Sequence, residues 1–159
     1  MLKYILIFFI SMIPVVELRG AIPFATFWGL DYFTALTVCV IGNMFPVPFI
    51  YFFARRVLLW GADRKYTGKY FRFFLDKGER GGQKLTKKTG RGGLFVALML
   101  FVGIPLPGTG AWTGSLIASL FDVNIKKAVL AELLGIVIAT IIMSILSYGL
   151  LDVIMGWFA

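Results

Sequence analysis

The stretch VVELRGAIPF, residues 15–24, places two opposite charges inside a long apolar region. Glu17 and Arg19 stand two positions apart, after 13 uncharged residues (Tyr4–Val16) and before another 11 (Gly20–Leu30). At membrane depth a charged side chain costs about 2.5–3.5 kcal/mol or more, so it normally faces a partner or a cavity. The stretch therefore indicates either a functional site or an ion pair that braces the fold.

The composition is that of a membrane protein. Hydrophobic residues make up 59% of the 159, whereas soluble domains hold about 45–50%. Residues 32–54 and 93–121 carry no charge, and residues 128–151 carry only Glu132. Each run reaches the roughly 20 residues that a spanning helix needs. We therefore predict an all-α, multi-pass protein of the plasma membrane, and the continuing apolar runs argue against a cleaved signal peptide.

The basic residues are concentrated in one segment. Twelve of the 16 lysines and arginines lie between Arg55 and Arg91, among only three acidic residues. Loops rich in Lys and Arg stay on the cytoplasmic side of a membrane, so residues 55–92 are expected to form a cytoplasmic loop. In so apolar a chain the excess charge indicates topology, and we expect no nucleic-acid partner.

The chain carries a weak internal repeat. At an offset of 91, which pairs Asp31 with Asp122, IPVVELRGAIPFATFWGLDYF from Ile13 aligns with IPLPGTGAWTGSLIASLFDVN from Ile104. In each copy a Pro/Gly break separates two apolar half-runs, and a full-length apolar run follows. Half-runs of 11–13 residues form about 16–20 Å of helix, too short to cross a bilayer core. Such pairs predict re-entrant hairpins, which enter and leave the membrane on one side.

The predicted architecture is an inverted repeat of a re-entrant helical hairpin plus a transmembrane helix. The alternative is four plain spans, in which each hairpin becomes one kinked helix. The hairpin topology keeps the basic loop and Lys126-Lys127 both in the cytoplasm and turns both termini outward, whereas four spans place this lysine pair outside. The segments are a first repeat 1–54 (hairpin 4–30, helix 32–54), the loop 55–92, and a second repeat 93–159 (hairpin 93–121, helix 128–151).

Within the loop, residues 63–76 are predicted to form an amphipathic helix on the inner leaflet. Aromatic residues recur at helical spacing from Tyr66 to Phe74, and basic residues occupy the other face. Anionic lipid headgroups are therefore expected partners. The Gly- and Lys-rich residues 78–93 are typical of a flexible connector.

Glu17 and Arg19 can have different roles in a transport site. Arg19 keeps its charge and suits an anionic group, whereas Glu17 can gain and lose a proton. The alternative is a mutual ion pair that only braces the hairpin tip. Glu132 could be a second proton-coupling group, or it could extend to the membrane interface beside Lys126-Lys127.

The tip of the second hairpin, PLPGTGAWTG at residues 105–114, carries no charge. We expect Thr109 to cap a helix that begins near Ala111, whose free N-terminal N–H groups would attract an anion. The alternative is a structural turn whose threonines satisfy only local backbone. The predicted substrate-binding residues are Arg19, Thr109, Gly110, Trp112 and Thr113.

Three further polar residues have structural or functional interpretations. Asn43, beside Pro46 and Pro48, either lines the cavity or bonds a carbonyl freed by a kink. Asp31 and Asp122 are expected to cap the helices that follow them.

The chain resembles the small multidrug export proteins over nearly its whole length, and three motifs carry the resemblance. They are ELRGAIP, GIPLPGTGAWTG and the basic segment KYFRFFLDKGERG. That family in turn resembles the DedA/VTT-domain proteins, which implies two opposed re-entrant hairpins and transport of lipid-linked phosphate with membrane-embedded acids and arginines. The matching positions here are Glu17 and Arg19. Gly108-Thr109-Gly110 stand where the DedA proteins have an arginine.

These observations predict a proton-coupled secondary transporter of an anionic amphiphile, such as polyprenyl phosphate or a phospholipid. The alternatives are an exporter of hydrophobic cationic drugs and a structural membrane protein without transport. We expect a homo-oligomer, because so short a chain shields a midplane site poorly. An enzyme is not expected, since the chain has no histidine and no evident nucleophile–base pair, and we expect no metal or cofactor.

Overall fold

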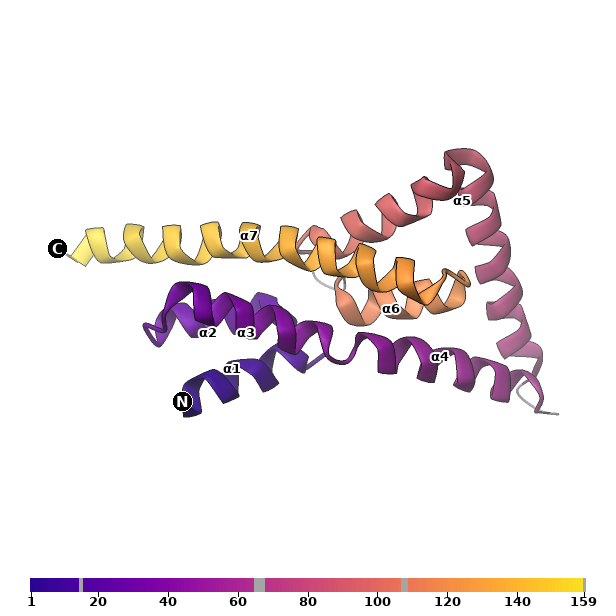
Figure 1. Cartoon of the computed structure of the whole chain (residues 1–159), viewed down its shortest axis with the longest axis horizontal. Coiled ribbons are helices and arrows are strands. Elements are labelled where there is room, and N and C mark those ends of the chain that lie inside the picture. Colours follow the sequence, from indigo (N-terminus) through magenta and orange to yellow (C-terminus); the bar gives the residue numbers. More distant parts are fainter. Residues whose placement is uncertain (15, 65–67, 107–108, 159) are drawn as a thin grey trace.

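The computed structural model describes all residues except 15, 65–67, 107–108 and 159, and this described part is helical without a strand. Both termini lie at the same end of the molecule (Figure 1). The helices are α1 (Leu2–Met12), α2 (Glu17–Phe27), α3 (Tyr32–Met44), α4 (Val47–Ala62), α5 (Gly68–Gly103), α6 (Ala111–Leu120) and α7 (Ile125–Phe158).

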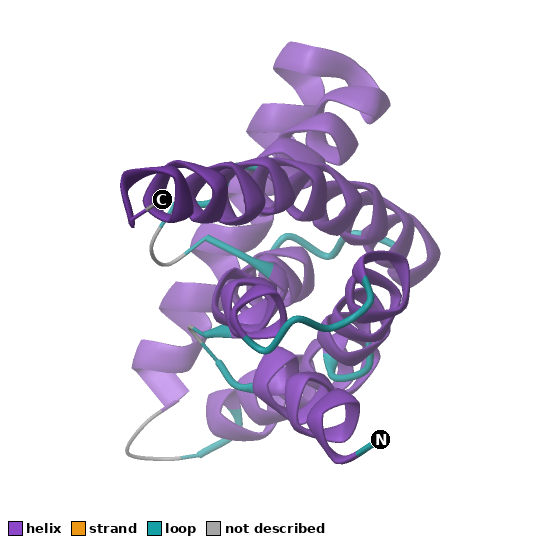
Figure 2. Cartoon of the chain, turned by 90° about the vertical axis from the view of Figure 1, so that its left-hand side faces the viewer, coloured by secondary structure: helices purple, strands orange, loops and turns teal. Residues whose placement is uncertain are grey.

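Small residues let the helices pack closely around a shared core. Figure 2 shows them gathered in a bundle, and α7 contacts α2, α3, α5 and α6. Ala21, Ala35 and Ala111 are fully buried in one core cluster, together with larger side chains such as Ile7 and Ile136. One core cluster therefore lies where the first three helices meet the last three, and a second lies among α4, α5, α6 and α7.

Two apolar stretches, Tyr32–Ala62 and Ile125–Gly149, are long enough to cross a membrane. The first contains the predicted helix 32–54 and continues to Ala62, and a turn at Phe45 and Pro46, where a kink was expected, divides it into α3 and α4. Proline has no N–H for the helix ladder, and its ring clashes with the preceding turn, so the break falls at Pro46.

The segment 78–93, expected to be a flexible connector, is helical within α5. Most residues between 79 and 89 are good helix formers, and their propensity offsets the glycines. The path bends at Gly90, whose φ of 74° and ψ of 176° are not helical. The predicted surface helix 63–76 falls partly outside the described residues, and its remainder from Gly68 belongs to α5.

The ends of α2 and α6 have the same geometry at an offset of 93 residues. Gly29 and Asp122 have φ values of 62° and 55°. Next to them, Leu30 N donates to Ala25 O at 3.1 Å, and Val123 N donates to Ala118 O at 2.9 Å. Both are the six-to-one bonds of a Schellman motif.

The caps of α3 and α7 follow the same offset. Asp31 accepts a bond from Thr34 N at 3.0 Å, which confirms the predicted cap of α3. The predicted cap of α7 by Asp122 is wrong, because Asn124 accepts from Lys126 N at 3.0 Å instead. Asp122 has left-handed backbone, and its carboxylate forms an ion pair with Arg55 of α4.

Candidate functional site

The first turn of α2 meets the break that precedes α6, about 90 residues later in the chain. Arg19 is the main link. Its Nη1 donates to the carbonyl oxygen of Thr109, and its Nη2 donates to Thr109 Oγ1 at 2.8 Å and to Ile104 O at 3.3 Å. The planar guanidinium thus ties together backbone that no helix ladder satisfies.

Glu17 lies between Arg19 and the N-terminus of α6. Its Oε2 is 3.3 Å from Arg19 Nη1, and its Oε1 accepts from the backbone N–H of Trp112 at 3.2 Å. The residue is only 3% exposed, and its φ of 49° is left-handed, which is rare outside glycine. Glu17 therefore supplies the carboxylate that caps α6.

Thr109 does not cap α6, contrary to our prediction, although α6 does begin at Ala111. Its hydroxyl lies 2.8 Å from the carbonyl oxygens of Ile104 and Leu106 and accepts from Arg19. Gly110 is the N-cap, with a φ of 153° and no side chain to offer. The Thr109 hydroxyl therefore bonds backbone within the break, and the N-terminus of α6 is capped by Glu17 instead.

Gly110 gives Glu17 and Arg19 the space they occupy. A Cβ on Gly110 would lie 2.6 Å from Glu17 Cδ and 2.7 Å from Arg19 Nη1, closer than real Cβ contacts. Its φ also disfavours any side chain. A glycine is therefore required at this position for the two charged groups to approach the backbone.

Trp112 connects the site back to the first break. Its indole Nε1 donates to Met12 O at 3.0 Å, at the end of α1. Thr113 is half-buried beside it, and no hydrogen bond involves its side chain in the described part of the chain. The structure thus gathers Glu17, Arg19, Thr109, Gly110 and Trp112 in one place, with Thr113 next to them but unconnected.

Glu132 does not extend to the interface, contrary to one of our two expectations. The residue is 0% exposed, and its Oε2 is 2.8 Å from the hydroxyl of Ser115 on α6. Lys126 and Lys127, a turn or more earlier on α7, are exposed. Full burial and the contact with Ser115 hold the Glu132 side chain inside the protein.

Residues 17–142 match the family model described as "Putative small multi-drug export protein". The chain belongs to this family. The matched range begins just after the first break and holds the second break and every residue of the site, from Glu17 to Glu132. No curated protein and no solved structure matches the chain. With its two long apolar helices, this member of an export family is a membrane protein.

Asn43 of this export-family protein is 1% exposed, and neither end of its amide has a partner among the described residues. It does not bond a carbonyl freed at the Pro46 break, which was one of the two expectations. The other expectation, that Asn43 lines a cavity, stays a prediction.

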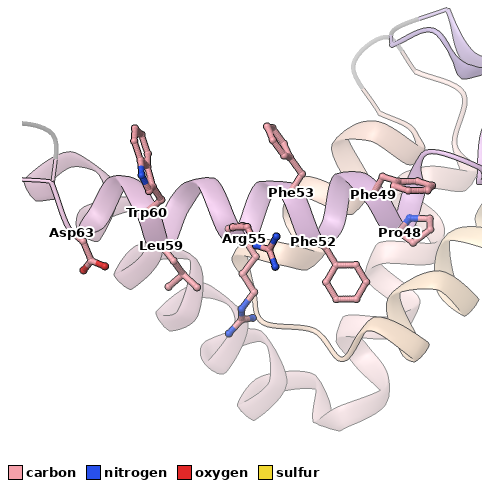
Figure 3. A pocket seen from close by; sticks show the side chains of 9 residues that line it. Pro48, Phe49, Phe52, Phe53, Arg55, Leu59, Trp60 and Asp63 are labelled. Atoms are coloured by element: carbon pink, nitrogen blue, oxygen red, sulfur yellow. The ribbon is translucent and has the colours of Figure 1, made fainter.

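The largest of the described cavities lies away from these residues. It has a volume of about 740 Å³ and runs along the outer face of α4 (Figure 3). Phe49, Phe52, Phe53 and Trp60 line it, and each is more than half exposed. Exposed aromatic rings along an apolar helix suit contact with lipid, so this groove is not evidence against the site at Glu17.

Proposed function

We propose that this protein is a proton-coupled secondary transporter of an anionic amphiphile, such as a polyprenyl phosphate or a phospholipid. One observation carries the proposal: the Glu17 carboxylate stands between Arg19 and the N-terminus of α6. Both groups attract anions, because a guanidinium is permanently charged and a helix end presents free N–H groups. Glu17 thus occupies the place that a substrate phosphate would take.

This arrangement supplies a coupling mechanism. When Glu17 takes up a proton, it loses the charge that pairs with Arg19 and caps α6. The guanidinium and the helix end then become available to an external anion. Arg19 Nε is buried without a partner among the described residues, which leaves a donor for that anion. Anion binding and ionisation of Glu17 exclude one another, so the anion moves together with a proton.

We further propose that the chain is an inverted repeat of two re-entrant hairpins, as in the DedA proteins, and that it assembles as a homo-oligomer. Matched caps and helix ends at an offset of 93 support the repeat. Reciprocal hydrogen bonds also connect the two breaks. Arg19 donates to Thr109 in the second break, and Trp112, its counterpart 93 residues later, donates to Met12 beside the first. Paired broken helices at midplane are typical of repeat-built transporters.

Export of hydrophobic cations is the second candidate, favoured by the description of the family. In that case Glu17 would be the counter-charge of the substrate and Arg19 only a brace. Neither candidate requires catalysis, a metal or a cofactor, and we propose transport without enzymatic activity.

The substitution Arg19→Lys separates the two candidates in reconstituted liposomes. A lysine keeps the charge but cannot bind phosphate through two parallel N–H groups. Transport of a fluorescent prenyl phosphate is expected to fall by about tenfold or more, since a hydrogen bond to a charged group contributes about 1.5–3 kcal/mol. Arg55→Lys is the matched control, because its ion pair with Asp122 lies at the surface, and it should leave transport unchanged.

A double-mutant cycle shows whether Glu17 and Arg19 form a transport site or a purely structural ion pair. If Glu17 and Arg19 only brace the fold, either single change to glutamine lowers stability by about 3–5 kcal/mol, and the double change recovers much of it together with transport. If they form the site, Glu17→Gln keeps anion binding but loses its pH dependence, and the double variant stays inactive. Restored transport in the folded double variant would overturn the proposal, and unimpaired cation export by Arg19→Lys would favour the second candidate.

A further inference from the structure

Glu132 and Ser115 form a buried polar pair that the mechanism above does not use. Both residues are 0% exposed. Ser115 Oγ lies 2.8 Å from Glu132 Oε2 and also 2.8 Å from the carbonyl oxygen of Ala111, in the first turn of α6. Glu132 Oε1 has no partner among the described residues.

Counting protons shows which state of Glu132 fits these distances. A hydroxyl has one proton, so Ser115 can donate to Ala111 O or to Glu132, but not to both. If Glu132 carries a proton, it donates to Ser115 Oγ, Ser115 donates to Ala111 O, and the remaining Oε1 is a neutral carbonyl oxygen. If Glu132 is ionised, Ala111 O loses this bond and a negative Oε1 is left buried without a donor. The protonated state satisfies the geometry, because an unpaired buried charge is far more costly than a neutral oxygen.

Among the described residues, no cation is placed to offset an ionised Glu132. In the described part of the chain, α6 and residues 92–103 of α5 carry no charged residue, and neither does α3. On α4, Arg55 is paired with Asp122 and Arg56 is exposed. The charged groups of α2 are Glu17 and Arg19, which are already paired with each other.

The fold itself does not require a polar pair here. At the offset of 93 that relates the two halves, Ser115 and Glu132 correspond to Ile22 and Cys39. These two are also fully buried and belong to the apolar core. The first half therefore fills the same place between its helices with apolar atoms, and the acid in the second half needs another explanation.

We propose that Glu132 is a second proton-binding site, which holds a proton in this conformation and is positioned by Ser115. The proposal rests on the transport function proposed above and adds a partner to Glu17. Glu17 and Glu132 approach α6 one turn apart, at Gly110 and Gly114. Repulsion between two such carboxylates disfavours ionisation of both, so Glu132 keeps its proton while Glu17 is ionised and bound to Arg19. Loss of that proton turns the Ser115 hydroxyl from Ala111 to Glu132 and so alters the first turn of α6, the same turn that Glu17 caps.

Infrared spectroscopy of the full-length protein in lipid at pH 7 tests this site without substrate. The wild type is expected to show the C=O stretching band of a protonated carboxylic acid, and Glu132→Gln should remove it. Ser115→Ala should keep the band but shift it, because the acid loses its hydrogen-bond acceptor. Ser119→Ala is the matched control, one turn further along α6, equally buried and with a hydroxyl that has no partner among the described residues.

A wild-type spectrum without the band, or a band that survives Glu132→Gln, would overturn the proposal. An equal shift in Ser119→Ala would overturn the role of Ser115. The shift in Ser115→Ala also keeps the test decisive if Glu132→Gln does not fold. Because the spectrum needs no transport, a protein that shows the band but moves no prenyl phosphate would refute the transport function and leave the proton site standing.

Discussion

At the scale of single residues, the site depends on one carboxylate with two partners. Glu17 and Arg19 could be identified from the sequence because charges are conspicuous in apolar runs. The sequence also grouped Arg19 with Thr109 and Trp112, but it could not predict the bonds themselves. Glu17 bonds a backbone N–H 95 residues away, and Arg19 bonds backbone carbonyl oxygens as well as the Thr109 hydroxyl. Ser115 was missed for a related reason: a hydroxyl in an apolar helix usually bonds its own backbone.

The substitution Gly110→Ala should strongly destabilise the protein, because Glu17 and Arg19 occupy the space beside this glycine. The added Cβ would displace Glu17 and Arg19, and the φ of 153° is strained for alanine by about 1–3 kcal/mol. The melting temperature in detergent is expected to fall further than for Gly29→Ala, where φ is 62° and a Cβ meets nothing within 4 Å, so that only about 1–2 kcal/mol of backbone strain arises. Equal losses in the two variants would mean that Glu17 and Arg19 do not need the space at Gly110.

At the scale of helices, the sequence predicted the breaks better than the register between the two halves. The Pro/Gly breaks and the start of α6 followed from local chemistry. The offset of 91 came from matching Pro14 to Pro105 and Asp31 to Asp122, whereas the backbone repeats at 93. Identical side chains can serve different roles, and here the residue equivalent to Asp31 is Asn124.

The two caps should respond differently to acid. Hydrogen bonds from the hydroxyl and the backbone N–H of Thr34 hold the pKa of Asp31 below its usual range. The stabilisation by this cap is present at neutral pH and is lost as the pH falls through the pKa of the folded state. The difference in melting temperature between wild type and Asp31→Ala should therefore shrink in acid, whereas Asn124→Ala should cost about 1 kcal/mol at every pH. A constant difference for Asp31→Ala would contradict the charged cap.

At the scale of the whole molecule, hydropathy is enough to predict an all-helical membrane protein, because burial in lipid requires long apolar runs with internally bonded backbone. The meeting of the two breaks was only implied by the repeat, since it depends on how Ala21, Ala35 and Ala111 let the helices approach. We predict the orientation of those helices in a bilayer from the positions of the basic residues, and a measured orientation would distinguish re-entrant hairpins from four plain spans.

Labelling of single cysteines in intact cells tests that orientation. The chain has one cysteine, the buried Cys39, so Cys39→Ala provides a background without thiols. In this background Lys126→Cys is the informative position, because hairpins place it in the cytoplasm and four spans place it outside. Phe33→Cys, at a site that is 78% exposed, lies outside in both topologies, and Gly92→Cys lies inside in both.

Twelve basic residues between Arg55 and Arg91 and the pair Lys126-Lys127 favour one common side of the membrane. A membrane-impermeant maleimide should therefore label Phe33→Cys alone until the cells are opened. Labelling of Lys126→Cys in intact cells would exclude the hairpin topology and, with it, an inverted repeat built from re-entrant segments.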